Sequence, residues 1–118
     1  MEESILDTIK YLLGIEKSQT AFDNEIIYNI NSAFMDLYQI GFGDKPFVLT
    51  DGSEEWSDAI DNNEFFESVK MYIFHKTKIS FDPPTSSFVL ESINKQLQEI
   101  EWRLYIQKEE FEKETENS

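Results

Sequence analysis

Apolar residues between positions 90 and 111 recur at alternating steps of three and four, and this spacing constrains the fold more than any other feature. Such steps keep side chains on one face of an α-helix. The sequence therefore predicts a long last helix that starts at Ser86 or Ser87 and ends near Glu110. Its apolar seam consists of Leu90, Ile93, Leu97, Ile100, Leu104 and Phe111, with Gln107 at the missing position.

The same segment carries two apolar side chains off the seam, Trp102 and Ile106. One interpretation, which we favour for the seam, is that it packs on the other helices of the same chain. The alternative is that one of the two faces meets a neighbouring subunit, because an exposed patch with a tryptophan lowers solubility unless it is covered. Both hold if each face has its own partner, and we expect Trp102 and Ile106 at a subunit contact.

Earlier segments also show helical spacing. A first helix is predicted over 2–13 and ends at Gly14, a second begins between Thr20 and Asp23 and ends at Gly41, and a third follows a capping box at 61–64 and stops before Pro83. The expected inward side chains are Ile5, Leu6, Ile9, Leu12 and Leu13 in the first, Ile26, Ile27, Ile30, Phe34, Leu37 and Tyr38 in the second, and Phe65, Phe66, Val69, Tyr72, Ile73 and Ile79 in the third.

The segment between Gly41 and Ser53 breaks this pattern, since glycines and Pro46 surround a short apolar run. We expect a protruding irregular loop or short hairpin near 41–52, rather than a core element. Its apolar residues are Phe42, Phe47, Val48 and Leu49. A short helix capped by Ser53 is expected to follow and to turn Trp56, Ala59 and Ile60 inward.

These patterns together predict a mainly all-α fold, a compact bundle of three to four main helices. The length of 118 residues suits one domain. We expect that domain over 1–111, followed by a disordered acidic tail over 112–118.

The charge is strongly negative, with 24 Asp and Glu against ten Lys and Arg and a net charge of −14. Such a surface repels phosphates and disfavours ordinary nucleic-acid binding. We interpret the acidic middle stretch as a solvated face, or as a rim or channel surface past which DNA slides without adhering. A calcium loop does not fit, because Gly52 directly follows Asp51. The stretch comprises Asp51, Glu54, Glu55, Asp58, Asp61, Glu64 and Glu67.

The sequence holds little that resembles catalytic chemistry. It has no Cys, and its one histidine, His75, has no Ser–His–Asp or His–Cys grouping around it. There is no phosphate loop, dinucleotide fingerprint or zinc motif, and no apolar run approaches a membrane span. We therefore expect neither enzymatic activity nor a cofactor, and no membrane partner.

Six short stretches resemble small head–tail connector proteins of tailed phages and prophages. They cover nearly the whole chain, in order and with the same element spacing. They read ILDTIK and LGI at 5–10 and 13–15, TAFD and INSAF at 20–23 and 30–34, FDPPTSSFVLES at 81–92, and EWRL at 101–104.

This resemblance implies a virion protein, assembled in the bacterial host cytoplasm, that forms a ring beneath the portal. The ring extends the DNA channel and docks head-completion or tail proteins, so DNA is passing cargo. The subunit is then a ring homo-oligomer when assembled, or a monomer in isolation. Proteins of this kind have no enzymatic activity and need no cofactor.

The charge also suits an alternative function, an acidic regulatory protein that imitates DNA and inhibits a nucleic-acid-binding host protein. That alternative predicts salt-sensitive binding to a basic host protein and no affinity for the portal. A third, a metal-dependent hydrolase, predicts a higher melting temperature with metal, which we do not expect.

Overall fold

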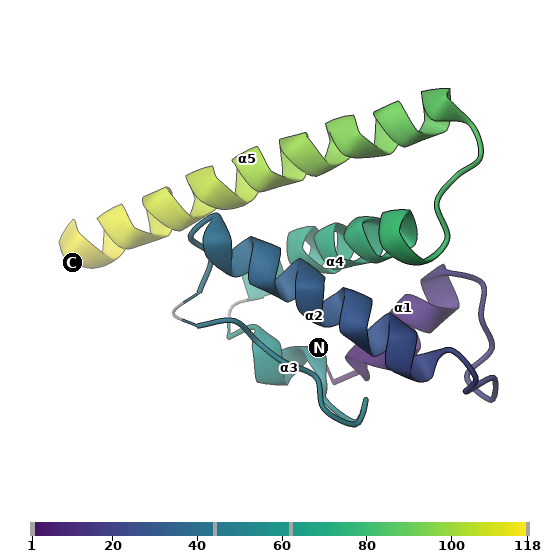
Figure 1. Cartoon of the computed structure of the whole chain (residues 1–118). Helices are drawn as coiled ribbons and strands as arrows, with labels where there is room; N and C mark the ends of the chain where they lie inside the picture. The colour runs from purple at the N-terminus through teal and green to yellow at the C-terminus, as the bar shows by residue number, and fades with distance from the viewer. Residues whose placement is uncertain (1, 44, 62, 118) are drawn as a thin grey trace.

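The structure, a computed structural model, describes residues 2–43, 45–61 and 63–117, and it is helical (Figure 1). No strand occurs in these residues, which confirms the predicted all-α bundle. The elements are α1 (Ile5–Leu12), α2 (Asp23–Gln39), α3 (Trp56–Ala59), the 3-10 turn η1 (Asn63–Phe65), α4 (Phe66–Phe81) and α5 (Ser87–Asn117).

Helix α4 lies at the centre of the bundle. It packs against α2 on one side and against α5 on another, and α1 contacts both α2 and α4. Figure 1 shows that α4 and α5 run in opposite directions, and that the C-terminal end of α5 extends past the rest of the bundle. The central position of α4 explains why Val69, Tyr72 and Ile73 are all buried.

The predicted apolar faces of α1 and α2 are largely correct, with one error in each. Ile5, Leu6 and Ile9 are buried on α1, as are Ile26, Ile30, Phe34 and Leu37 on α2. Leu12 and Tyr38 were expected inside but are exposed, at 37% and 40%. Both lie in the last turn of their helix.

Several predicted helix ends shift in the structure. The Ser4 hydroxyl caps α1 by accepting a hydrogen bond from the Asp7 amide at 3.2 Å, so the helix starts at Ile5 rather than at residue 2. Helix α2 begins after Phe22, within the predicted range from Thr20 to Asp23, and its N-cap residue makes no side-chain capping hydrogen bond. Glu55, rather than Ser53, is the N-cap of α3.

The start of α4 and the end of α5 lie later in the sequence than predicted. The η1 turn precedes α4, and Asn62 of the predicted capping box lies outside the described residues. The Ser86 hydroxyl accepts from the Val89 amide at 3.4 Å at the start of α5. The helix continues to Asn117, past the expected end near Glu110. The division into a domain over 1–111 and a disordered tail over 112–118 stays a prediction.

The segment after α2 is irregular, as expected, but it packs on the core instead of protruding. Leu49 is only 2% exposed, and the Asn31 side chain hydrogen-bonds both its amide, at 2.7 Å, and its carbonyl, at 3.0 Å. The ring of Phe47 lies 5.4 Å from that of Phe34. Phe42 similarly packs edge-on against Phe65. Only Val48 of the four apolar loop residues is exposed, so the prediction of a non-core protrusion was wrong.

Gly52 lies close against Leu6 of α1. Its φ of +86° lies in the left-handed region, and a Cβ atom there would come within 2.6 Å of the Leu6 Cδ2 atom. Gly14 has a similar φ of +82°, but a Cβ atom would meet nothing within 4 Å. A substitution at Gly14 therefore introduces backbone strain alone, whereas a substitution at Gly52 introduces both backbone strain and steric overlap.

We expect Gly14→Ala to lower the free energy of unfolding by about 1 to 2 kcal/mol, the cost of left-handed backbone for a residue with a side chain. Gly52→Ala should cost about 2 to 4 kcal/mol, because overpacking against Leu6 adds to that strain. Urea unfolding followed by helical circular dichroism measures both. Equal losses for the two variants would contradict the close contact.

Candidate assembly surface

The inner face of α5 holds this helix against α4. Leu97, Ile100 and Leu104 are buried, whereas Leu90 and Ile93 nearer the start of the helix are half-buried. The side chains of Gln107 and Phe111, also placed on the seam by the sequence, are outside the described residues. The seam thus serves intramolecular packing where the structure describes it.

A polar contact supports this packing. The Tyr72 hydroxyl of α4 donates a hydrogen bond to the Glu101 carboxylate of α5 at 3.2 Å. Burial raises the pKa of Tyr72, and the negative charges of Glu101 and Asp36 raise it further. The phenol therefore stays protonated and keeps donating this hydrogen bond at neutral pH.

The outer face of α5 carries an exposed aromatic pair, which we call the α5 aromatic pair: Trp102 and Tyr105. Their side chains are 62% and 47% exposed, and their rings stack with centroids 6.1 Å apart. Ile106, the other residue predicted at a subunit contact, is half-buried. Tyr105 was not predicted at this surface, although its position three residues after Trp102 places the two on one helix face.

A second exposed apolar patch, also missed, lies at the start of α5. Phe88 is 78% exposed and Val89 is 43% exposed. Both residues belong to the stretch at 81–92 that resembles connectors, and their exposure became apparent only in the fold. Helix α5 thus presents uncovered apolar side chains near its start and in its second half.

The acidic stretch is spread over several elements instead of forming one cluster. Glu54 is half-buried; burial raises its pKa, but hydrogen bonds from Thr50 and Gly52 outweigh this effect and hold the pKa below its usual value. Hydrogen bonds from Ser53 lower the pKa of Asp51. Both carboxylates thus stabilise the turn at 50–54 by accepting hydrogen bonds within it.

The remaining acidic side chains face solvent from the turn before α3 through to the first turn of α4. Glu67 pairs with Lys70 at 3.2 Å, and the Asp58 carboxylate accepts from the Glu55 amide at 2.9 Å. The described residues hold no group of three or more His, Asp or Glu arranged to bind a metal. The exposed acidic side chains of the whole stretch are Asp51, Glu55, Asp58, Asp61, Glu64 and Glu67.

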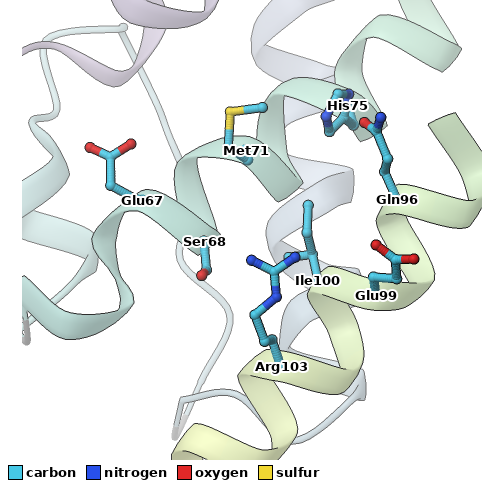
Figure 2. Close-up of a pocket in the computed structure, with 8 residues that line it drawn as sticks. All are labelled: Glu67, Ser68, Met71, His75, Gln96, Glu99, Ile100 and Arg103. Carbon is cyan, nitrogen blue, oxygen red and sulfur yellow. The ribbon is translucent and has the colours of Figure 1, made fainter.

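One pocket lies between α4 and α5, with a volume of about 270 Å³. The helix α4 contributes Ser68, Met71 and His75 to its wall, and α5 contributes Gln96, Ile100 and Arg103 (Figure 2). His75 is only 8% exposed, and burial lowers its pKa. Neither ring nitrogen has a hydrogen-bond partner among the described residues.

The comparisons agree with the architecture. Across the described residues, no helix has both the length and the apolar character needed to cross a bilayer. A family model described as phage connector protein matches residues 5–111. Neither the curated proteins nor the solved structures gave a match. Phage connectors are a structural, non-enzymatic kind of protein. Since the match extends over nearly the whole sequence, the chain belongs to the phage connector protein family.

Proposed function

We propose that copies of this chain form a ring beneath the portal of a tailed phage or prophage particle. The ring extends the DNA channel and docks a head-completion or tail protein, with no enzymatic activity of its own. The observation that carries this proposal is the family match over residues 5–111. Membership in a connector family supports a role between other particle proteins.

The α5 aromatic pair supports the contact between subunits. A closed ring of identical subunits needs two different patches on each chain, one that meets the preceding copy and one that meets the next. Tryptophan and tyrosine contribute much of the binding energy in protein interfaces because they bury a large, rigid surface. We therefore place Trp102, Tyr105 and Ile106 at one of the two patches.

The acidic surface suits the channel or its rim. The exposed carboxylates from Asp51 to Glu67 carry the same sign of charge as the DNA backbone, so they offer few adhesive contacts to passing DNA. A lining of this kind lets DNA move through the ring.

Joint replacement of Trp102 and Tyr105 by alanine tests the subunit contact. We expect association with the portal to weaken at least about 30-fold, the loss typical of an interface hot spot. The free energy of unfolding should change by less than about 1 kcal/mol, because both side chains are exposed. Electron microscopy and sedimentation of the protein mixed with its portal give the readout.

Tyr28→Ala is the matched control, since Tyr28 is an exposed aromatic residue on α2, at 74%. It should leave ring formation unchanged. No ring on the portal with the unaltered chain would overturn the proposal. Salt-sensitive binding to a basic host enzyme, without portal association, would support the DNA-mimic alternative in its place.

A further inference from the structure

Helix α5 carries a second row of side chains, on the face that points away from α4. Leu97, Ile100 and Leu104 are buried on the inner face, so positions about half a turn from them point outward. The outward positions recur at alternating steps of four and three, which is the spacing of a coiled-coil seam. We call this row the outer seam, and it consists of Phe88, Ser92, Lys95, Glu99, Trp102 and Ile106.

The outer seam is open to a partner. Phe88 and Trp102 are largely exposed, and of the other members only Ile106 is half-buried. Figure 1 shows the rest of the described chain on one side of α5. A helix of a second molecule can therefore lie along the outer seam without meeting the remainder of the bundle.

Charge is concentrated in the middle of the outer seam, and apolar side chains lie towards its ends. Phe88 stands at one end, and Trp102 and Ile106 stand at the other. Lys95 and Glu99 occupy the middle. Within the part of the chain that the structure describes, neither of these two forms an ion pair. Two opposite charges are thus available to a partner on the same face as the exposed tryptophan.

A second copy of the chain in antiparallel orientation matches this pattern. When a two-fold axis passes between the two helices at the level of position 97, residues at equal distances before and after that position face one another. Apolar side chains then meet at both ends, opposite charges meet in the middle, and a small serine leaves room for each indole. The facing residues are Phe88 with Ile106, Ser92 with Trp102, and Lys95 with Glu99, and the symmetry forms each contact twice.

Other arrangements of two copies fit less well. Parallel helices place Lys95 against Lys95 and Glu99 against Glu99, so like charges repel in the middle of the seam. An antiparallel shift by one heptad brings Glu99 against Phe88 in one direction and against Trp102 in the other, which buries a carboxylate against an aromatic ring. The charged layers therefore select both orientation and register, as polar residues in coiled-coil seams do.

We propose that two copies of the free chain pair through their outer seams as an antiparallel dimer, which covers Trp102 before assembly. The ring proposed above uses Trp102 and Ile106 at a subunit contact, so the dimer and the ring exclude each other. The dimer therefore separates when the chain assembles on the portal. Because the seam spans only about 27 Å of helix, the association is weak, with a Kd on the order of 30 µM.

Charge reversal tests the register by sedimentation equilibrium of the chain without the portal. Glu99→Lys sets lysine against Lys95, and Lys95→Glu sets glutamate against Glu99. We expect each variant to weaken the dimer at least about 10-fold, equivalent to ~1.4 kcal/mol. The double variant Lys95→Glu/Glu99→Lys again has opposite charges in both layers, so its Kd should return to within about threefold of the original value.

The two single variants change the net charge in opposite directions, so a loss common to both does not come from net charge. Glu25→Lys is the matched control, because Glu25 is an exposed acidic residue on α2. It should leave the Kd unchanged. Circular dichroism checks that every variant folds, as expected for substitutions at exposed positions.

A distance measurement tests the orientation. The chain has no cysteine, so Ser87→Cys at the start of α5 provides a single site for a nitroxide label. In the antiparallel dimer the two labelled positions are about 30 Å apart, whereas in a parallel dimer they are about 10 Å apart. Pulsed electron paramagnetic resonance distinguishes these distances.

The proposal is wrong if the chain stays monomeric at about 500 µM, far above the expected Kd. It is equally wrong if the single charge reversals leave the Kd unchanged, if the double variant dimerises as weakly as the single ones, or if the labels lie at the shorter distance. All of these measurements use the chain without the portal, so a failure of the dimer is distinct from a failure of ring assembly.

Discussion

Replacement of Trp56 by alanine should lower the free energy of unfolding by about 3 to 5 kcal/mol, the range for removing a large aromatic side chain from a core. Trp56 is fully buried, its ring lies 5.8 Å from that of Phe66, and its indole N–H donates to the Thr8 hydroxyl at 3.1 Å. One side chain thereby connects α3 to both α1 and α4. Because the free energy of unfolding of a domain of this size is about 5 to 15 kcal/mol, the variant should lose a large part of its stability.

Trp102→Ala is the control for this experiment. It removes the same kind of side chain from a position that is 62% exposed, so the change in stability should stay within about 0.5 kcal/mol. Urea unfolding followed by helical circular dichroism measures both variants. A loss below 1 kcal/mol for Trp56→Ala would show that α3 and the turn before it contribute little to the folded state.

Replacement of Lys10 by methionine should produce the second large effect. Lys10 is 1% exposed; its ammonium pairs with Asp23 at 2.8 Å and donates to the carbonyls of Lys17, at 3.1 Å, and Gln19. It therefore holds the connection between α1 and α2 in place. Methionine keeps the apolar stem but leaves the carboxylate and two carbonyls without their donor.

We expect this variant to lose about 2 to 3 kcal/mol, less than the 3 to 5 kcal/mol of a fully buried pair. We expect a smaller loss of stability than for a fully buried pair because Asp23 is 25% exposed and water can solvate part of its charge. Lys17→Met is the control: Lys17 is 83% exposed and pairs with Asp7 at 3.4 Å, so its loss should cost about 0 to 0.5 kcal/mol. Equal midpoints of urea unfolding for the two variants would contradict a structural role for Lys10.

The helices themselves could be predicted because their signals are local. The three-and-four spacing of Leu97, Ile100 and Leu104 already places these side chains on one face, and proline after Asp82 ends the preceding helix whatever surrounds it. The connector resemblance, drawn from stretches of adjacent residues, likewise agrees with the family match.

Only part of the candidate assembly surface could be predicted from the sequence. Trp102 was identified from its place off the seam, but Tyr105 and Phe88 were missed because a spacing pattern does not state which face a neighbour covers. The same limit applies to the pocket. Its walls come from α4 and from α5, which meet only in the folded chain.

The helices, the all-α class and the family could be inferred from the amino-acid sequence, since each depends on contacts within a few residues along the chain or on short motifs. The burial of Lys10 and Leu49 and the exposure of Leu12 became apparent in the folded chain, because burial depends on which distant segments meet. Leu49 belongs to the core, and its backbone is hydrogen-bonded by the side chain of Asn31, eighteen positions earlier; no periodicity encodes a contact of that range.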